Sequence, residues 1–176
     1  MTYFLCFFIF SFLGWILECI FDYFKTKRFQ NRKTMKYLPL CPVYGISVSI
    51  MFFIKNFIGK NLIFNFILGL IVCTSVEYSF NAFFKNFYRI KFWDYSGEKL
   101  NLRGNICVNF SLIWGIFSMI LLSFSQNLMV FFSFFPNYIT FFLYFCFIVD
   151  LFATLYFLKK EDIEKIKFYC QGAKKA

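Results

Sequence analysis

Three acidic residues lie inside long apolar runs of this sequence: Glu18, Glu77 and Asp150. An ionised carboxylate near the middle of a lipid bilayer costs about 2.5–3.5 kcal/mol on insertion scales, so such groups seldom face lipid and usually mark a functional site. The chemistry they could perform is the binding of a cation, a proton or a polar headgroup. The alternative is a purely structural role, in which the acids are satisfied by hydroxyls and amides of neighbouring helices.

Small or polar residues accompany each acid at the spacing of a helix. They are Ser11, Gly14 and Asp22 beside Glu18, Cys73, Thr74 and Asn81 beside Glu77, and Cys146 and Thr154 beside Asp150. Residues three or four positions apart share one face of a helix, so each acid belongs to a polar stripe. We expect these stripes to face the inside of a helical bundle.

The composition places the chain in a membrane. Hydrophobic residues make up 60% of the 176 residues and aromatic residues 26%, against about 45–50% apolar residues in an ordinary soluble domain. The net charge of +10 could suggest nucleic acid, but the basic residues lie between apolar runs without a zinc signature, so we expect no nucleic-acid partner.

Histidine is absent and the seven cysteines are scattered without a C-x-x-C pair. The first fact excludes histidine-assisted catalysis and zinc sites that need imidazole, and the second offers no disulfide framework. We therefore expect no cofactor, no metal and no catalytic residue.

Five apolar runs are long enough for a helix of about 20 residues, the length that crosses a bilayer. They cover residues 2–24, 40–58, 62–84, 106–124 and 137–158. The sequence thus predicts an all-α membrane protein, a bundle of five transmembrane helices within a domain at 1–158. Residues 128–135 form a shorter apolar run before Pro136, predicted to be an interfacial or re-entrant turn, and 159–176 a charged tail with a short surface helix.

The basic residues predict the orientation, because Lys and Arg accumulate on the cytoplasmic side. Of the 19 basic residues, only Lys55 and Lys60 fall outside the connections at 25–36 and 85–103 and the tail. The N-terminus is therefore predicted outside and the C-terminus in the cytoplasm. The three acids then lie roughly 9–12 Å inside the cytoplasmic interface at 1.5 Å per residue, and we expect them to meet in one cytoplasm-facing chamber, with Arg32 or Arg103 reaching in from the loops.

Further candidates lie on the same side. Cys41 and Tyr44 lie in a motif where two prolines fix the direction in which the helix begins, with simple helix initiation as the alternative. A reactive thiol is a separate candidate role for Cys41, although no base lies near it in the sequence. The connection at 85–103 and the glycine after it are expected to form a folded hairpin capping the bundle. The candidate substrate-binding or ion-binding residues are Glu18, Glu77, Asp150, Trp93, Asp94, Tyr95, Asn101, Arg103, Cys41, Tyr44, Cys107, Ser111 and Trp114.

Several short motifs resemble a known bacterial family. They are Phe12-Leu13-Gly14-Trp15 with Glu18, Asn31-Arg32, Cys41-Pro42-Val43-Tyr44-Gly45, Glu77-Tyr78, Trp93-Asp94-Tyr95, Asn101 with Gly104, Ile106-Cys107, and Ser111-Leu112 with Trp114-Gly115. In this order they resemble the family labelled putative ABC-transporter type IV, whose members are named as ABC transporter permeases. The resemblance implies a membrane-spanning transporter subunit.

The expected function is therefore a permease-like subunit in the cell membrane, with a polar site open to the cytoplasm. The sequence has no G-x-x-x-x-G-K-[ST] motif, so ATP hydrolysis would need a separate ATPase subunit, and five helices would need a homo-oligomer to enclose a pathway. Two alternatives remain. One is a membrane-embedded enzyme whose acids act as general acid and base on a lipid headgroup, and the other is an accessory protein that stabilises a partner complex.

Overall fold

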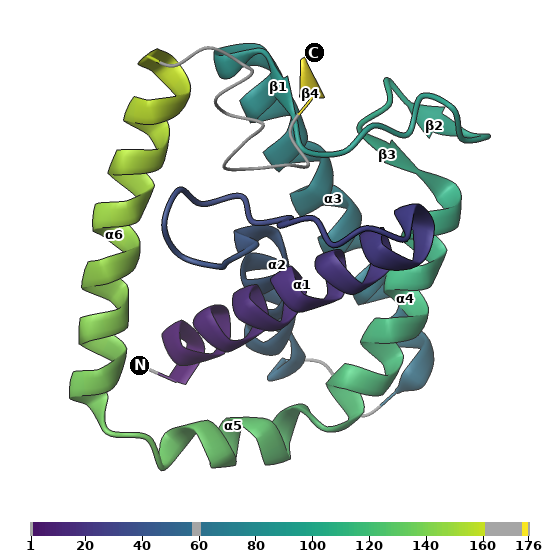
Figure 1. Ribbon diagram of the computed structural model, residues 1–176. Coiled ribbons are helices and arrows are strands. Elements are labelled where there is room, and N and C mark those ends of the chain that lie inside the picture. Colours follow the sequence, from purple (N-terminus) through teal and green to yellow (C-terminus); the bar gives the residue numbers. More distant parts are fainter. Residues whose placement is uncertain (1, 58–60, 161–173, 176) are drawn as a thin grey trace.

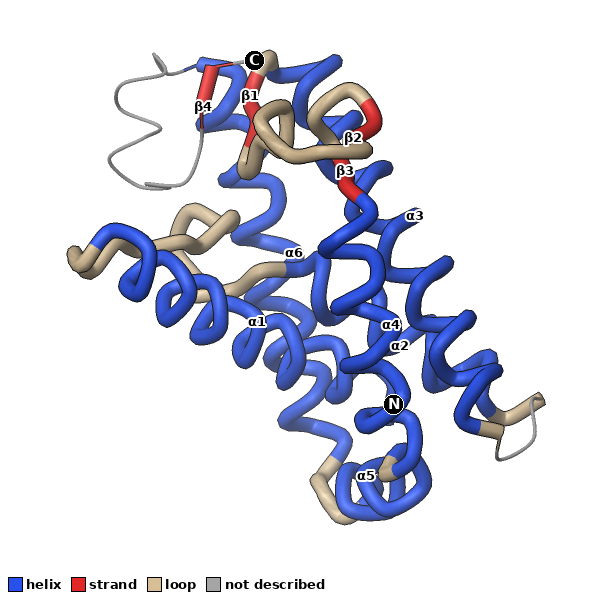
Figure 2. The backbone as a smooth tube through the Cα atoms, turned by 90° about the vertical axis from the view of Figure 1, so that its right-hand side faces the viewer, coloured by secondary structure: helices blue, strands red, loops and turns tan. Residues whose placement is uncertain are grey.

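The computed structural model describes residues 2–57, 61–160 and 174–175, which form six helices and four short strands (Figure 1). In chain order these are α1 (Thr2–Thr26), α2 (Pro42–Lys55), α3 (Leu62–Tyr88), β1 (Ile90–Lys91), β2 (Asn101–Leu102), β3 (Ile106–Cys107), α4 (Val108–Ser123), α5 (Ser125–Ser133), α6 (Asn137–Lys160) and β4 (Lys174–Lys175). The first three strands gather at one end of the helices and α5 lies at the other (Figure 2).

The protein is a mostly helical membrane protein with three or four candidate spans. Within the described residues, α1, α3 and α6 are each long and apolar enough to cross a membrane, and α4 with α5 passes the same test as one span bent by 58°. The run at 128–135, predicted as an interfacial or re-entrant turn, lies mainly in α5. Of the charged tail predicted at 159–176 with a short surface helix, residues 159–160 belong to the end of α6 and 174–175 to β4, and the rest lies outside the described residues.

Two predicted helices are shorter than expected, for local reasons. The run at 40–58 begins its helix at Pro42, which occupies the first turn, where a missing N–H costs nothing. The helix predicted at 106–124 begins at Val108 because Ile106 and Cys107 pair with Leu102 and Asn101 as an antiparallel hairpin. The four short strands form two antiparallel pairs, β2 with β3 and β1 with β4, and the other elements of the described residues are helices.

Small residues allow two helix pairs to pack closely. Gly45 of α2 lies against Ser11 and Phe7 of α1, and Gly69 of α3 lies against Ser118 of α4, without room for a Cβ atom in either place. Close backbone approach through small residues is a principal source of helix association in lipid, where apolar packing gains nothing from the exclusion of water. The pairs α1–α2 and α3–α4 have the most extensive contacts in the fold.

The helices α1 and α2 run in opposite directions. Near the start of α1, the backbone carbonyl of Tyr3 accepts a hydrogen bond from Ser49 Oγ at 3.2 Å, and its hydroxyl accepts one from Asn56 Nδ2 at 2.6 Å. Towards the other end, the N–H of Cys41 donates to the carbonyl of Ser11 at 2.9 Å. The end of α2 therefore lies beside the beginning of α1.

The first loop (27–41) connects the bundle to α6. The backbone N–H groups of Tyr37 and Leu38 donate to the two carboxylate oxygens of Asp150 at 3.0 and 2.7 Å, and the N–H of Lys36 donates to Thr154 Oγ1 at 2.9 Å. In Figure 1 this loop extends from the end of α1 towards α6. Asp150 therefore anchors the loop.

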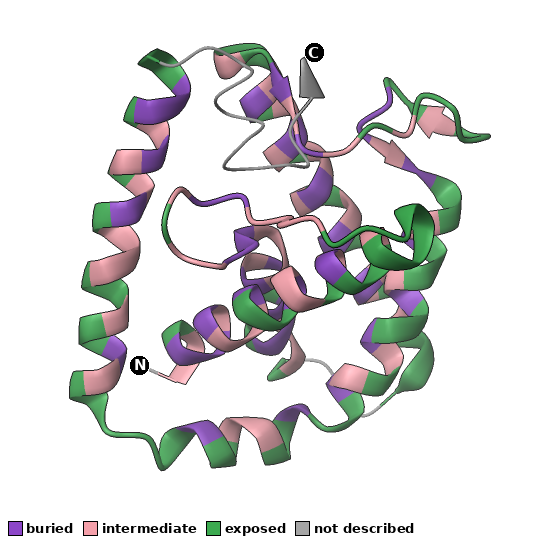
Figure 3. Ribbon diagram, viewed as in Figure 1, coloured by how far each residue is buried: buried purple, intermediate pink, exposed green. Residues whose placement is uncertain are grey.

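Apolar side chains cover the outer surface of α6. Phe141, Phe145 and Phe152 are each more than 60% exposed, and Figure 3 shows exposed and half-buried positions along most of this helix. A continuous exposed apolar surface of this kind marks a membrane or protein contact rather than a water interface.

Replacing Asp150 with asparagine should release the first loop from α6. The amide keeps the size of the side chain but loses the charge that accepts the N–H bonds of Tyr37 and Leu38, and hydrogen bonds to a charged group contribute about 1.5–3 kcal/mol. We expect a lower melting temperature in detergent and faster tryptic cleavage after Lys33 and Lys36.

The matched control is Phe152→Leu, at a residue of the same helix that is 69% exposed. It should leave both the melting temperature and the cleavage rate near those of the wild type. Equal cleavage of Asp150→Asn and wild type would show that the loop does not depend on this carboxylate.

Candidate functional site

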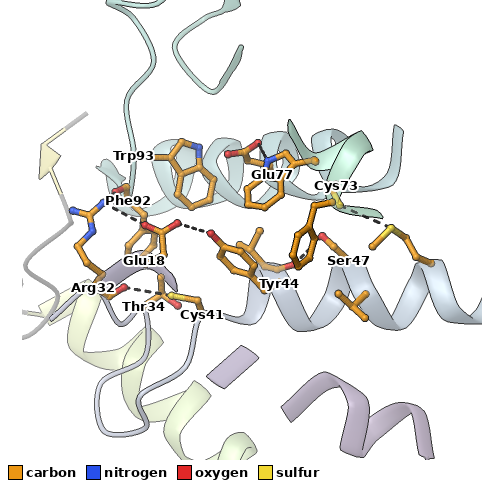
Figure 4. A pocket seen from close by; sticks show the side chains of 15 residues that line it. Glu18, Arg32, Thr34, Cys41, Tyr44, Ser47, Cys73, Glu77, Phe92 and Trp93 are labelled. Atoms are coloured by element: carbon orange, nitrogen blue, oxygen red, sulfur yellow. Dashed lines mark hydrogen bonds and ion pairs between the residues drawn. The ribbon is translucent and has the colours of Figure 1, made fainter. Parts of the chain in front are cut away.

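Four helices and two loops surround a small cavity (Figure 4). Its polar lining includes Glu18 of α1, Arg32 of the first loop, Tyr44 of α2 and Glu77 of α3. The cavity volume is about 60 Å³, and roughly 10–15 Å³ suffices for one water molecule by this measure. The space therefore accommodates a few water molecules or one small chemical group.

Glu18 is paired with a cation from the first loop. Arg32 Nη2 lies 3.8 Å from Glu18 Oε2, and Arg32 Nη1 lies 3.9 Å from Asp22 Oδ1, one helical turn further along α1. Arg32 also donates to the carbonyl of Phe92 at 3.5 Å. The guanidinium thus shares its charge between two acids and ties the first loop to the segment that follows α3.

Tyr44 connects Glu18 to the opposite wall. Its hydroxyl donates to Glu18 Oε1 at 2.7 Å, and its ring meets the ring of Trp114 edge to face, with centroids 5.4 Å apart. Gly14 lies against the Tyr44 ring without room for a Cβ atom. The tyrosine is therefore fixed between α1 and α4.

Glu77 is held by neutral donors. The Tyr95 hydroxyl donates to Glu77 Oε1 at 2.7 Å and the Trp114 indole N–H donates to Oε2 at 3.3 Å. The residue is only 5% exposed, and in the part of the chain that the structure describes no Lys or Arg nitrogen lies within 4 Å of it. The two acids of the cavity therefore have different surroundings.

The hairpin segment (89–107) is held in place by buried amides. Asn81 Nδ2 donates to the carbonyl of Trp93 at 3.3 Å and to Asn105 Oδ1 at 3.2 Å, and the Trp93 indole N–H donates to the carbonyl of Asn105 at 2.9 Å. These bonds position Trp93 as a wall of the cavity. Asn81 could be expected to face the bundle because it shares a helix face with Glu77. Asn105 was not among the predicted site residues.

The turn of the hairpin segment is stabilised by Asp94 and Asn101. Asn101 Oδ1 accepts from the N–H of Gly104 at 3.0 Å, and Gly104 has a positive φ of 72° that suits glycine. Burial opposes the ionisation of Asp94, but hydrogen bonds from Ser96 and Lys91 outweigh it and lower the Asp94 pKa. Asp94 and Asn101 therefore shape the turn rather than line the cavity.

The structure brings together some of the predicted site residues and separates others. Those that line the cavity are Glu18, Cys41, Tyr44, Glu77, Trp93 and Trp114. Tyr95 reaches it through its bond to Glu77. Cys107 and Ser111 are buried at the start of α4, bonded to each other through the Cys107 carbonyl at 3.1 Å.

Asp150 and Arg103 lie apart from the cavity. Asp150 faces the first loop instead of meeting Glu18 and Glu77 in one chamber, because that loop passes between α6 and the other helices and its N–H groups occupy the carboxylate. Arg103 is exposed in the turn of the hairpin segment, at a φ of 55°. Of the two arginines expected to reach the acids, Arg32 does so.

Two apolar helices of spanning length, α1 and α3, line a cavity with two acids together with α2 and α4, so the fold is that of a membrane protein with a cavity between its helices. The model of the family described as "Putative ABC-transporter type IV" matches residues 5–155, and the chain belongs to this family. The matched range contains every residue of the cavity. No curated protein and no solved structure matched the chain.

Arg32 and Arg103 provide a matched test of the ion pairs. Arg32→Ala leaves Glu18 and Asp22 near each other without their cation, and we expect it to lower the melting temperature in detergent by an amount equivalent to about 1–3 kcal/mol. Arg103→Ala removes the same charge from an exposed turn and should change the melting temperature little.

A second substitution tests the cause. Adding Asp22→Asn to Arg32→Ala should restore part of the lost stability, because it removes one of the two unpaired acids, and a double-mutant cycle measures that coupling. Equal melting temperatures for the two arginine variants, or the absence of any restoration, would contradict the role of Arg32.

Proposed function

We propose that this protein is a permease-like membrane subunit of an ABC-type transporter, with its polar site open to the cytoplasm. The observation that carries the proposal is the cavity between α1, α2, α3 and α4. It is lined by Glu18 and Glu77 of two apolar helices and by Arg32 of the first loop, in a chain that belongs to this family. Acidic residues within membrane helices commonly mark the path of a substrate or ion. A purely structural role would not require a cavity beside them.

The proposal includes five membrane crossings. The first loop bonds both to Phe92 after α3 and to Asp150 in α6, which supports placing the C-terminal ends of α1, α3 and α6 on one side. The contacts of Tyr3 with Ser49 and Asn56 support the return of the chain through α2 to the other side.

The short length of α2 is compatible with a crossing. Its 14 residues extend about 21 Å at 1.5 Å per residue, less than the roughly 30 Å of a bilayer core. The non-helical residues 38–41 continue the path before it, with a tight turn in which the N–H of Leu40 donates to the carbonyl of Leu38 at 2.9 Å. Leu40 and Cys41 are buried in the protein, the condition under which non-helical backbone is tolerated at membrane depth.

Charge favours an orientation with the N-terminus outside and the C-terminus in the cytoplasm of a cell. The C-terminal ends of α1, α3 and α6, together with the segments that follow them, contain all of the basic residues except Lys55 and Lys60, and basic residues accumulate on the cytoplasmic side. In this orientation the cavity opens near the inner surface. The separate ATPase subunit would then dock on the first loop and the hairpin segment, and a second copy of the chain would complete the pathway.

Reporter fusions test the orientation. We expect green fluorescent protein fused to the C-terminus to fluoresce, and alkaline phosphatase to be active when fused after Lys60 but inactive when fused after Arg103, because the enzyme folds only outside the cytoplasm. The matched pair of phosphatase fusions controls for expression. Activity in the opposite pattern would contradict the orientation, and equal activity of the two phosphatase fusions would contradict the crossing by α3 that lies between them.

Co-purification tests the transporter assignment. The tagged full-length protein, extracted in a mild detergent, should bring down an ATPase with a P-loop motif, because this sequence has none of its own. The Glu77→Gln variant serves as the matched control, since its change lies within the cavity and should leave the partner bound. Purification without any ATPase under several detergents would favour a membrane-embedded enzyme or an accessory protein.

A further inference from the structure

Aromatic rings form much of the cavity wall. Phe92, Trp93, Trp114 and Phe117 line it together with Tyr44. The chain contains 32 phenylalanines but only three tryptophans, so two tryptophans at one small cavity do not follow from the general abundance of phenylalanine. The rings of Tyr44 and Trp114 are nearly perpendicular, at 85°, with centroids 5.4 Å apart, and so form two adjoining walls.

The polar edges of these rings already have partners in the protein. The Tyr44 hydroxyl donates to Glu18, the Trp93 indole N–H to the carbonyl of Asn105, and the Trp114 indole N–H to Glu77. An anion or a sugar would need such donors for itself. What the rings retain for an occupant is their π-electron surface, which attracts cations electrostatically.

The charges around the cavity favour a cation as well. Arg32 is shared between Glu18 and Asp22, so the three groups together carry a negative charge when ionised. Glu77 adds a second negative charge when it is ionised, and the two groups that donate hydrogen bonds to it, the Tyr95 hydroxyl and the Trp114 indole, are neutral. A buried carboxylate of this kind is stabilised by a positive partner.

The surroundings suit an organic cation better than a metal ion. Calcium requires six to eight oxygen ligands and magnesium near-octahedral oxygen coordination, and the described residues include no group of three His, Cys, Asp or Glu side chains that could hold a metal ion. Aromatic walls beside one carboxylate are the arrangement that recognises methylated ammonium groups. The volume of about 60 Å³ corresponds to roughly four water molecules, which suits one such headgroup.

We infer that the cavity binds a small organic ammonium cation, whose charge is held by Glu77 and whose substituents contact the rings of Trp93, Trp114 and Tyr44. The inference deepens the proposed function by naming the class of substrate for the same site. The ammonium group belongs either to a free cation or to the headgroup of a choline lipid, since both present the same chemistry to the site.

Equilibrium binding of tetramethylammonium tests the inference. The purified full-length protein, in nanodiscs of phosphatidylglycerol, is titrated with tetramethylammonium chloride and, separately, with sodium chloride at matched ionic strength. Calorimetry and tryptophan fluorescence follow the binding. We expect saturable binding of tetramethylammonium and none of sodium.

Two cavity variants and one control locate the site. Glu77→Gln should weaken binding at least tenfold because it removes the charge, and Trp114→Leu should weaken it about 2- to 30-fold, the range of a cation–π contact. Trp114→Phe keeps a ring and should bind with intermediate affinity. Trp15→Phe changes the tryptophan that does not line the cavity and should bind like the wild type, and gel filtration confirms that each variant is folded.

Binding of tetramethylammonium no tighter than that of sodium, or unchanged binding by folded Glu77→Gln, would overturn the inference. Addition of phosphatidylcholine to the nanodiscs identifies the source. Competition with tetramethylammonium assigns the site to a lipid headgroup, and undiminished binding assigns it to a free cation.

This measurement is independent of the transporter assignment, because the purified protein needs no ATPase to bind a ligand. Absence of ammonium binding by a protein that still co-purifies with an ATPase would overturn the ligand alone. Ammonium binding by a protein without an ATPase partner would overturn the transporter assignment and leave the cation site intact.

Discussion

The carboxylates of Glu18, Glu77 and Asp150 lie among apolar helices, where water is scarce, and each has a partner in a loop. Glu18 is paired with Arg32 of the first loop, Glu77 accepts from Tyr95 of the hairpin segment, and Asp150 accepts backbone N–H groups of the first loop. Leaving any of these acids unpaired in the bilayer would cost several kcal/mol. The need to pair these acids therefore favours loops that fold back between the helices, and it accounts for the positions of the first loop and the hairpin segment.

The same constraint accounts for the irregular backbone beside the cavity. The first loop can remain non-helical up to Pro42 because backbone groups of the loop are satisfied inside the protein: the N–H of Cys41 donates to Ser11, and that of Leu38 donates to Asp150. The small residue Gly45 then lets α2 approach α1 closely enough for Tyr44 to reach Glu18. The cavity is thus the space that remains where loops and helices meet.

The sequence predicted the apolar helices because they depend on a feature along one chain segment, namely its apolar length. It did not predict which faces meet. Glu18, Glu77 and Asp150 were expected at one depth, yet Asp150 faces the first loop. Which arginine pairs with Glu18 likewise depends on how each loop folds, because Arg32 and Arg103 both lie near predicted helix ends. The first residue of α4 could not be predicted from its own segment, because it depends on the pairing of β2 with β3.

Glu18 and Glu77 have different surroundings, and this difference decides which of them can attract a cation that the site binds and then releases. Arg32 is held by Glu18, Asp22 and the Phe92 carbonyl, so it contributes a fixed charge that does not depend on an occupant. Among the described residues, Glu77 accepts hydrogen bonds from Tyr95 and Trp114, and these neutral donors satisfy its oxygens without adding a positive charge. An arriving cation would therefore gain its attraction from Glu77. When the cation leaves, these hydrogen bonds still satisfy both oxygens, so the empty site does not contain a carboxylate without partners.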